Sequence, residues 1–543
     1  MLSPAFPNAR LLPTRSVSTP VQVSLLAQIL RLHPDQSLVS YLIQGFSEGF
    51  SLGVRGVVSQ DHTSNLQSAL SNPAATAQAI QKEVSRGHTH GPFWEPPFHP
   101  CHTSPIGIVA KKDGSFRLIL DLSSNHAGSV NECIDIDEVS MKYCSFDDAV
   151  ELLLDAGPKP FMAKVDIKHA FRLCPVHPDE WPLLCFMWAG AFFFDSCLPF
   201  GLRSSPFIFN SFADALLWYL ANPLAIERII HYLDDFFLCH VSFDACQADM
   251  QRLISLFHHL GVPLAPDKVC GPTTCITFLG IEIDTIDRTI RLPADKFKDL
   301  LDLLTAWEGK QGCVKRELLA LIGHLSFAAK VVKPGRLFLR RLIDASTSVS
   351  QLHHHIHLSH DTKEDITWWR TFLPSWNGIA YIQDHPISSN DLHLFTDASI
   401  LGIGGVFGDH WFSIPISAFH HIPWFPQVDE VFDINFWELL ALFVAFLTWE
   451  HLFRNIQVTI HTDNEPLVYV WSRGSRNTRI MRLIRALFLR SARANTNLLL
   501  AHIPGHFNTL ADHLSRLQVR RFRVAHPTAD EEPSPIPPDV WQI

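Results

Sequence analysis

Two adjacent acidic residues, Asp234 and Asp235, stand between apolar runs in the segment RIIHYLDDFFLCH. β-branched and aromatic residues fill both runs, so the segment predicts a β-hairpin with two carboxylates at its tip. A third acid, Asp166, ends the apolar run PFMAKVD, and a second strand can place it beside that tip. Crowded carboxylates repel one another and lose hydration, and divalent cations are the usual reason that a protein tolerates them. An isolated Asp-Asp pair is also ordinary turn chemistry, so this pair needs support from the rest of the chain.

A second set of acids follows residue 390. It consists of Asp397 in FTDAS, Glu438 in NFWELLAL, Asp463 in HTDNE and Asp512 in NTLADHLSR. Two of these acids end apolar strands and two lie in helical segments. Glu438 stands in the most apolar helix of the chain, where an acid needs a partner or a metal. Four carboxylates that meet at one sheet edge predict a site for two divalent ions able to activate water against a phosphodiester.

Charge is distributed unevenly along the chain. The net charge of −10 is unfavourable for contacts with phosphates, so local cationic clusters must supply any such contact. Such clusters are present at Lys111, Lys112 and Arg117, at Lys330, Lys333, Arg336, Arg340 and Arg341, and at Arg473, Arg476, Arg479 and Arg482. The last series predicts a phosphate-facing stripe, with a solvated helix face as the alternative.

The cysteines and the apolar runs indicate where in the cell the protein is expected to be. The 11 cysteines show no repeated CxxC spacing, which favours a reducing, intracellular location without distinguishing cytoplasm from nucleus. The longest apolar runs, such as those from Leu183 and Leu439, are too short to span a bilayer, so no membrane partner is expected.

The 543 residues predict several domains. Pattern changes divide the chain into an N-terminal helical region at 1–95, an α+β region at 96–290, a helical region at 291–350, a connection at 351–388, an α/β region at 389–518 and a charged, Pro-rich, disordered tail at 519–543. The His-rich segment HHHIHLSH at 353–360 is interpreted as a solvated connector, with metal binding as the alternative.

The first acid set and its surroundings resemble the reverse transcriptase family, over roughly Gly91 to Arg516. YLDD at 232–235 and AKVDIKHAF resemble the family's metal-binding motifs, which implies Asp166, Asp234 and Asp235 as ligands beside Tyr232. FLGIEID at 278–284 resembles the primer-grip hairpin, and the helical stretch after Leu292 resembles the thumb. The resemblance implies a right-hand polymerase of fingers, palm and thumb.

Further segments carry the resemblance to the substrate-binding side. SPIGIVAKKDGSFRLILDLS resembles the fingers, implying that Lys111 or Lys112, with Arg117, meets the incoming triphosphate. LPFGLRSSPFIFN resembles the template-contacting turn, with Phe200 and Gly201 in the turn and Pro206 near the start of the next helix. Phe171 occupies the steric-gate position, with a core aromatic as the alternative. Lys268 also has a family parallel beside the site, with a surface lysine as the alternative.

The second acid set resembles the ribonuclease H family, in the order Asp, Glu, Asp, Asp with Gly402, Gly404 and Gly405 after the first Asp. HIPGHFNTLADHLSR resembles the last active-site element of retroelement members, which implies that His506 assists proton transfer or product release; a plain loop histidine is the alternative.

The two sets together predict an α+β multidomain protein, a polymerase followed by a ribonuclease H-like α/β domain. We expect a retroelement RNA-directed DNA polymerase that also hydrolyses the RNA of RNA–DNA hybrids, with two Mg²⁺ per site and Mn²⁺ as an alternative. Its partners would be an RNA template, a DNA primer, the hybrid and deoxynucleoside triphosphates. SPIGIVAKKDGSFRLILDLS, HYLDDFF and KVVKPGRLFLRRL look closest to DIRS-like and Ngaro-like retrotransposons. There are two rival interpretations. The chain could be a non-catalytic descendant that keeps the fold and binds its partner, or an enzyme in which only one of the two sites is active.

Overall fold

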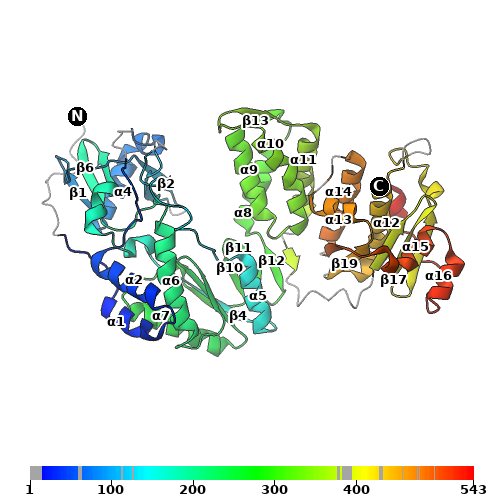
Figure 1. Cartoon of the computed structure of the whole chain (residues 1–543), viewed down its shortest axis with the longest axis horizontal. Coiled ribbons are helices and arrows are strands. Elements are labelled where there is room, and N and C mark those ends of the chain that lie inside the picture. The colour runs from blue at the N-terminus through cyan, green and yellow to red at the C-terminus, as the bar shows by residue number, and fades with distance from the viewer. Residues whose placement is uncertain are drawn as a thin grey trace. The chain divides into compact units, whose positions relative to one another are not determined.

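The computed structural model describes residues 15–58, 64–111, 114–124, 128–375, 379–381, 394–426, 432–454, 456–473, 475, 477–494 and 496–542. The chain forms two compact units, Met1–Leu279 and Gly280–Ile543. Helices and strands are mixed in both units (Figure 1). None of the described helices is both long and apolar enough to cross a membrane.

The first unit is built around an antiparallel sheet in the order β7-β8-β4-β9. A second sheet has the order β1-β6-β5, and β2 pairs with β3. The strands are β1 (Thr89–Phe93), β2 (Ile106–Ala110), β3 (Phe116–Leu120), β4 (Phe161–Asp166), β5 (Cys185–Trp188), β6 (Ala191–Asp195), β7 (Ile229–Tyr232), β8 (Asp235–His240), β9 (Cys270–Thr273) and β10 (Cys275–Phe278).

Helices pack on this sheet and join its strands. They are α1 (Val23–Ile29), η1 (Leu30–Leu32), α2 (Gln36–Glu48), α3 (Gln67–Leu70), α4 (Pro73–Ser85), α5 (Phe146–Ala156), η2 (Ala170–Leu173), η3 (Pro178–Leu184), α6 (Ser205–Ala221), α7 (Phe243–His259) and η4 (Pro266–Lys268), where η marks a 3-10 helix. Local sequence explains their starts: Ser145 and Asp148 form a capping box at α5, and a proline opens α6. The N-terminal region is part of this unit, because Phe46 of α2 packs edge-on against Phe212 of α6.

The second unit begins with small strands and a group of helices. These elements are β11 (Ile281–Asp284), β12 (Thr289–Arg291), α8 (Ala294–Ala306), β13 (Gly312–Val314), α9 (Lys315–Ala328), η5 (Lys333–Leu339), α10 (Arg340–Thr347), β14 (His355–His357), α11 (His360–Ser375) and β15 (Ile379–Tyr381). The connection predicted at 351–388 therefore contains a packed helix, because Trp369 and Phe372 of α11 are buried.

The rest of the second unit is a five-stranded sheet in the order β18-β17-β16-β19-β20, in which β19 runs parallel to both its neighbours. Its elements are β16 (Leu394–Ala398), β17 (Gly402–Phe407), β18 (His410–Pro415), η6 (Ile416–Phe419), α12 (Ile434–Trp449), η7 (Glu450–Leu452), β19 (Gln457–Thr462), α13 (Glu465–Arg473), α14 (Thr478–Arg493), β20 (Asn497–His502), η8 (Gly505–Phe507), α15 (Thr509–Ser515), α16 (Val519–Ala525) and η9 (Pro538–Gln542).

Glycines allow α15 to lie close to this sheet. A Cβ on Gly404 of β17 would stand 2.5 Å from the Cβ of Leu514 in α15. Real side chains do not tolerate that approach, so a residue without a side chain is needed there. The close approach brings α15, which carries Asp512, onto the strands that precede the other acids.

The tail differs from its prediction as a disordered segment. Phe522 of α16 is fully buried and packs against Trp411 of β18, with ring centroids 5.3 Å apart. The indole Nε1 of Trp411 donates a hydrogen bond of 2.8 Å to the backbone carbonyl of Asp530. The charged, Pro-rich composition predicts disorder because it does not reveal that a few apolar residues dock on a distant hairpin.

Candidate active sites

The three acids of the first unit lie at one end of the β7-β8-β4-β9 sheet. Asp166 closes β4 and stands directly opposite Asp235, the first residue of β8. Asp234 lies in the two-residue turn before β8, where Leu233 has a positive φ of 52°. The backbone N–H of Ile167 donates a 2.9 Å hydrogen bond to the carbonyl of Asp234, which holds the turn against β4. Strand register thus brings together three acids that are up to 69 positions apart in the sequence.

Burial and mutual repulsion disfavour the ionised acids. Asp166 is buried, and burial followed by the charge of Asp166 raises the pKa of Asp234. Burial raises the pKa of Asp235 to about 6, although the Lys164 ammonium opposes the shift. One carboxylate oxygen of Asp235, Oδ1, is buried without a hydrogen-bond partner among the described residues.

Two lysines partly neutralise this cluster. The Nζ of Lys268 donates a 2.8 Å hydrogen bond to Oδ2 of Asp166, and Lys164 Nζ lies 3.9 Å from Oδ2 of Asp235. Lys268 therefore lies beside the acids, at the position suggested by the family parallel. The chemistry of the donor set fits a divalent cation, because carboxylate oxygens are hard ligands and one of them lacks any partner here.

Three predicted substrate-binding residues form a stack beside the acids. Phe171, in η2, lies five positions after Asp166, and its ring centroid is 5.3 Å from that of Phe200. The guanidinium of Arg117, at the start of β3, lies 4.4 Å from the centroid of the Phe200 ring. Phe171 is partly buried and also packs against the hydrophobic core, with its ring centroid 5.9 Å from that of the buried Phe209.

Gly201, Tyr232 and Lys111 are the other predicted substrate-binding residues that the structure describes. Gly201 has a φ of 110°, and a Cβ there would stand 2.1 Å from the carbonyl oxygen of Leu120, so glycine is required. Tyr232 pairs with Asp235 in the β7–β8 hairpin. Lys111 is exposed just after β2, and Lys112 lies outside the described residues.

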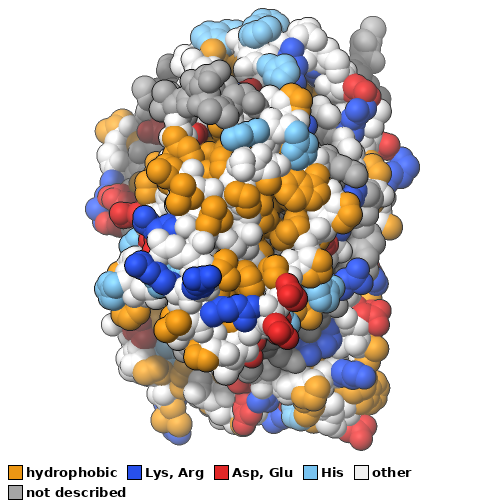
Figure 2. Space-filling view, turned by 90° about the vertical axis from the view of Figure 1, so that its right-hand side faces the viewer, with side chains coloured by type: hydrophobic (Ala, Val, Ile, Leu, Met, Phe, Trp, Pro, Cys, Tyr) orange, Lys and Arg blue, Asp and Glu red, His pale blue; other side chains and the backbone are white. Residues whose placement is uncertain are grey.

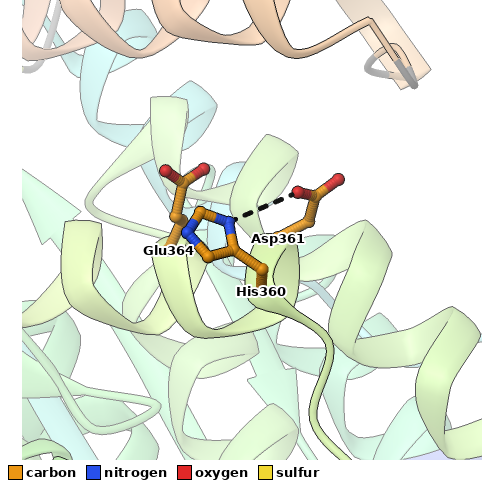
Figure 3. A group of neighbouring side chains, drawn as sticks. All are labelled: His360, Asp361 and Glu364. Atoms are coloured by element: carbon orange, nitrogen blue, oxygen red, sulfur yellow. Dashed lines mark ion pairs between the residues drawn. The ribbon is translucent and has the colours of Figure 1, made fainter.

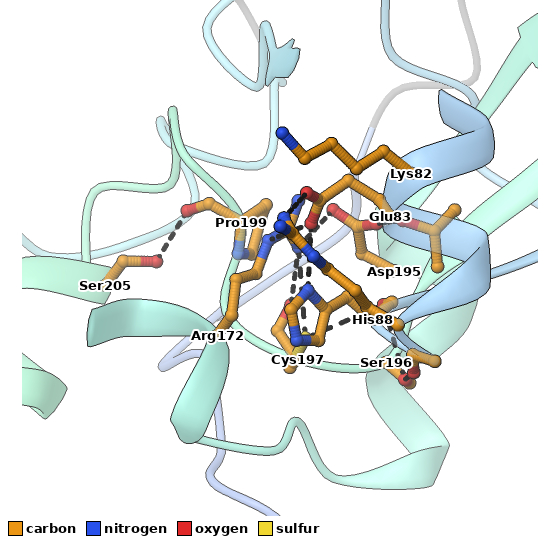
Figure 4. Close-up of polar contacts among 12 residues, drawn as sticks. Lys82, Glu83, His88, Arg172, Asp195, Ser196, Cys197, Pro199 and Ser205 are labelled. Atoms are coloured by element: carbon orange, nitrogen blue, oxygen red, sulfur yellow. Dashed lines mark hydrogen bonds and ion pairs between the residues drawn. The ribbon is translucent and has the colours of Figure 1, made fainter. Parts of the chain in front are cut away.

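A buried ion cluster holds η2 in place (Figure 4). Arg172, which follows Phe171, donates a 2.7 Å hydrogen bond to Oδ2 of Asp195 in β6. Its Nε also lies 3.4 Å from Oε2 of Glu83 in α4. Asp195 in turn accepts a hydrogen bond of 2.5 Å from Thr89 in β1. The N-terminal region therefore contributes directly to the support under Phe171.

Three of the four predicted acids of the second unit lie close together. One carboxylate oxygen from each of Asp397, Glu438 and Asp463 lies within 4.8 Å of the others. Asp397 lies near the end of β16, Glu438 in the first turns of α12, and Asp463 directly after β19. β16 and β19 are parallel neighbours, so their carboxyl ends meet at one sheet edge.

Two members of this cluster, Asp397 and Glu438, have raised pKa values. Burial, followed by the charge of Asp397, raises the pKa of Glu438 to about 9. Burial also raises the pKa of Asp397 to about 7, with added repulsion from Asp463 and Asp512. The Oε2 atom of Glu438 is buried without a hydrogen-bond partner among the described residues. A divalent cation would satisfy that oxygen and favour the ionised forms.

The segment around Asp512 closes the site. Asp512, on α15, receives a 2.6 Å hydrogen bond from Nε of Arg516. Asn508 donates from Nδ2 to Oδ1 of Asp463 at 3.3 Å and to the carbonyl of Thr396 at 3.0 Å. The ring of His506 is tilted against that of Phe507, with centroids 4.1 Å apart, on the exposed turn η8. That turn passes near the acids, since a Cβ on Gly505 would lie 3.1 Å from Oδ2 of Asp463.

Sequence reasoning overlooked three residues that contact the acids. Lys164 precedes Asp166 by two, and the period of a strand places both on one face. Asn508 and Ser515 flank Asp512, and Ser515 donates its hydroxyl to Asp397. The spacing of four and three around Asp512 is helical, so this signal was present in NTLADHLSR.

The arginine series has a mixed role in the structure. Arg482 of α14 stacks over Trp424, 4.3 Å from its ring centroid, and Arg485 bonds Glu364 and Asp365 of α11. Arg479 also lies on α14, whereas the side chains of Arg473 and Arg476 lie outside the described residues. Part of this stripe is therefore occupied by contacts within the protein.

A further group with metal-ligand spacing occurs at the start of α11 (Figure 3). His360, Asp361 and Glu364 place ligand atoms within 4.8 Å of one another. Asp361 lies 3.5 Å from the guanidinium of Arg341, and Glu364 lies 2.8 Å from that of Arg485. Because both carboxylates already face arginines, the group is an ion-pair cluster.

Comparisons with known proteins agree with these two sites. Residues 109–283 match the family model described as reverse transcriptase (RNA-dependent DNA polymerase). Residues 388–490 match the RNase H-like domain found in reverse transcriptase.

Relatives with these domains are longer proteins. The Gag-Pro-Pol polyprotein of Squirrel monkey retrovirus is 26% identical over 238 residues, which cover 42% of this chain and 12% of the relative. The Retrovirus-related Pol polyprotein from transposon opus of Drosophila melanogaster is 21% identical over 435 residues, covering 78% of this chain and 40% of the relative. This chain therefore corresponds to less than half of either polyprotein.

Among solved structures, a foamy viral protease-reverse transcriptase in complex with double-stranded DNA aligns over 92% of this chain and 84% of its own, with a TM-score of 0.49 and 14% identity. The domain assignment rests on the two family matches and on the acids within them. The chain thus carries a reverse transcriptase domain followed by an RNase H-like domain of the kind found in reverse transcriptases.

Proposed function

We propose that this chain is an RNA-directed DNA polymerase that also hydrolyses the RNA strand of RNA–DNA hybrids. One observation carries the proposal: each domain has a cluster of buried and partly buried acids with one buried carboxylate oxygen that lacks a partner among the described residues, Oδ1 of Asp235 in one and Oε2 of Glu438 in the other. Unsatisfied buried carboxylates are costly, so a bound cation is the simplest explanation for both.

In the polymerase site, Asp166, Asp234 and Asp235 would hold two Mg²⁺, with Mn²⁺ as an alternative. Bound there, the ions would help the primer 3′-hydroxyl to lose its proton and would neutralise the charge of the leaving pyrophosphate. Arg117, held over Phe200, would pair with the triphosphate together with Lys111 or Lys112. Phe171 would exclude a ribose 2′-hydroxyl, while Phe200 and Gly201 would shape the wall toward the template. Tyr232 would support the turn that carries the acids.

In the nuclease site, Asp397, Glu438, Asp463 and Asp512 would hold the second pair of ions, which supply an activated water. Asn508 orients Asp463 by its hydrogen bond, and Ser515 does the same for Asp397. His506, on the exposed turn beside Asp463, would move a proton or help release product.

The decisive experiment is primer extension on a poly(rA) template with Mg²⁺, paired with cleavage of a labelled RNA–DNA hybrid by the same preparation. Both activities are expected. A chain that binds the hybrid but performs neither reaction would be the non-catalytic descendant. Loss of one reaction alone would identify an enzyme with a single live site.

The finer assignments are also proposals. We place fingers and palm at 96–290, thumb at 291–350, connection at 351–388 and the ribonuclease H domain at 389–518. The partners would be an RNA template, a DNA primer, the hybrid and deoxynucleoside triphosphates, inside the cell. A retroviral and a transposon polyprotein among the relatives support a retroelement origin. The assignment to the DIRS-like or Ngaro-like subgroup depends on the residues found in the motifs.

Sugar selection should depend on Phe171. We expect Phe171→Ala to reduce the preference for deoxyribonucleotides over ribonucleotides by about 10- to 200-fold, because the aromatic ring no longer fills the space of a 2′-hydroxyl. Single-nucleotide incorporation with each triphosphate measures the change. Phe243→Ala, at a half-exposed ring on α7, is the control and should leave selectivity unchanged. Retained activity with unaltered selectivity would remove Phe171 from the site.

Metal binding should be visible as a pH-dependent stabilisation. Glu438 and Asp397 have pKa values raised to about 9 and about 7, so the folded state keeps protons that the unfolded state has released. Without metal, their contribution to stability should therefore fall as pH rises from about 4 to 9. Mg²⁺ binds the ionised forms, so the gain in Tm on adding Mg²⁺ should grow over the same range.

Thermal unfolding of the full chain in chelator and in Mg²⁺, at pH 5 and pH 8, measures this effect. In Glu438→Gln the metal-free protein should lose most of the pH dependence, because the most strongly shifted group no longer titrates. The Mg²⁺-induced gain should also shrink. An equal Mg²⁺ effect at both pH values in the unsubstituted chain would contradict this account of the cluster.

A further inference from the structure

Phe171 and Phe200 form an aromatic wall beside the polymerase acids, with ring centroids 5.3 Å apart. Arg117 lies 4.4 Å from the centroid of the Phe200 ring, and its charge opposes the rise in the pKa of Asp234. The wall is therefore close to the acids in space as well as in sequence. Phe171 lies in η2, a single 3-10 turn. Such a short turn has little stability of its own, so contacts with other elements must fix the direction of the ring.

Arg172, the residue after Phe171, supplies such contacts through a buried guanidinium. Only 3% of its side chain is exposed. Its Nη1 donates a hydrogen bond of 2.7 Å to Oδ2 of Asp195 and a longer one of 3.4 Å to the carbonyl of Cys197. Asp195 ends β6, and Cys197 lies three positions before Phe200. One side chain thus joins the turn that carries Phe171 to the segment that carries Phe200.

The third contact of Arg172 comes from the N-terminal region. Nε of Arg172 has no hydrogen-bond partner among the described residues, but it lies 3.4 Å from Oε2 of Glu83 in α4. Glu83 is itself held on both oxygens, by Arg86 at 3.2 Å and by Nδ1 of His88 at 2.9 Å. Figure 4 shows the carboxylates of Glu83 and Asp195 beside the Arg172 guanidinium.

The second carboxylate is more than the charge of Arg172 requires, because Asp195 alone neutralises one guanidinium. A guanidinium presents its donors in a rigid planar fork, so acids at Nη1 and beside Nε together restrict its orientation. The neighbouring Phe171 ring is restricted with it. An active-site group misplaced by about 1 Å can cost on the order of 100-fold, so a ring that excludes a single hydroxyl has to be held this firmly.

We propose that Arg172 is a positioning residue for the wall of Phe171 and Phe200, and that Glu83 gives the N-terminal region control over the choice between deoxyribonucleotides and ribonucleotides. This role rests on the proposed polymerase function and on Phe171 as the residue that excludes a 2′-hydroxyl. It extends that function, because Arg172 and Glu83 act through the ring and not on the nucleotide. Glu83 also lies outside residues 109–283, which match the reverse transcriptase family.

The test measures the preference of Glu83→Gln for deoxyribonucleotides in the full chain. Glutamine keeps the shape of the side chain and removes the charge beside Nε of Arg172, while Asp195 still neutralises the guanidinium. The quantity is the ratio of kcat/KM for incorporating one deoxyribonucleotide to kcat/KM for the matching ribonucleotide. We expect this ratio to fall by about threefold to tenfold, because a less firmly held ring excludes the hydroxyl less well.

A ratio measured on one preparation does not depend on the fraction of chains that are folded. A merely structural role would lower incorporation of both nucleotides equally and leave the ratio unchanged. Arg172→Lys approaches the same contact from its other side: lysine keeps the buried charge, which favours folding, but loses the planar fork. It should lower the ratio to a similar extent.

A double variant asks whether the effect passes through the ring. In the Phe171→Ala background, Glu83→Gln should change the ratio by less than about twofold, since no ring remains to be positioned. Glu48→Gln is the matched control, because it removes the same charge from an exposed position in α2 and should leave the ratio unchanged.

Hybrid cleavage gives a second control on the same preparation. The second unit, one side of which Figure 2 shows with its exposed Lys, Arg and apolar side chains, contains none of the substituted residues. Cleavage by Glu83→Gln should therefore stay within about twofold of that by the unsubstituted chain.

The outcomes separate this role from the functions on which it rests. No primer extension by the unsubstituted chain would refute the polymerase function. An unchanged ratio in Phe171→Ala would refute Phe171 as the excluding residue, and the role of Arg172 with it. With a reduced ratio in Phe171→Ala, an unchanged ratio in Arg172→Lys would refute the positioning role, and an unchanged ratio in Glu83→Gln would refute control by the N-terminal region. A full effect of Glu83→Gln in the Phe171→Ala background would also overturn the role, because that effect would not pass through the ring.

Discussion

The Asp235→Asn variant should lose DNA synthesis by on the order of 10³- to 10⁴-fold while its ribonuclease activity survives. Asparagine keeps the shape of the side chain and leaves the β4–β8 pairing intact. It removes one negative charge from the cluster with Asp166 and Asp234, and a cation bound through carboxylates does not tolerate that loss. The pKa of Asp235 is raised to about 6, so the substitution should not weaken the metal-free fold.

Primer extension and hybrid cleavage by one preparation give this comparison directly. Asp244→Asn, at an exposed acid in the first turn of α7, is the matched control and should extend primers within about twofold of the unsubstituted chain. Extension by Asp235→Asn at a tenth of the normal rate or more would show that this carboxylate holds no essential metal.

Asp463→Asn should have the reverse effect, with hybrid cleavage reduced by on the order of 10³-fold and DNA synthesis nearly intact. Asp463 shares its cluster with Asp397 and Glu438, and its Oδ1 already accepts a hydrogen bond from Asn508. An asparagine at 463 would present its side-chain oxygen to the Asn508 amide, so the local structure can be kept. The lost charge cannot be replaced.

A control lies two residues further along the chain. Glu465 is exposed in the first turn of α13, and Glu465→Gln should cleave hybrid at a nearly normal rate. Some cross-talk between the two activities is expected, because both sites would hold one A-form-like hybrid. Loss of both activities in either Asp463→Asn or Asp235→Asn, in a protein still folded and able to bind hybrid, would rule out two independent sites.

The acids could be identified in the sequence because strand and helix patterns locate them. Asp166 and Asp397 each close an apolar run, and a carboxylate that closes a strand must lie at a sheet edge. The helical pattern around Glu438 places an acid in an apolar helix, which requires a partner. What the pattern cannot supply is the partner between elements, such as the contact of Lys268 with Asp166 across 102 positions.

The tail shows where local composition misleads. Its acids and prolines resemble a solvated segment, yet Phe522 and Val540 are fully buried. Phe522 packs on Trp411, more than a hundred positions earlier, so no short window of the sequence contains both sides of the contact. Helix α11, in the predicted connection, is held by a similar contact between elements: Trp368 stacks on Phe338 of η5, with ring centroids 3.8 Å apart.

The Arg172 cluster bears on where the reverse transcriptase domain can be divided. The reverse transcriptase family match begins at residue 109, but Glu83 and Thr89 precede it and both contact the buried Arg172–Asp195 pair. A fragment cut at that boundary would leave a buried guanidinium with one of its two carboxylates, and breaking a buried ion pair costs about 3 to 5 kcal/mol. The family match is thus shorter than the segment that this ion cluster holds together, and we expect a stable fragment of the reverse transcriptase domain to need α4 as well.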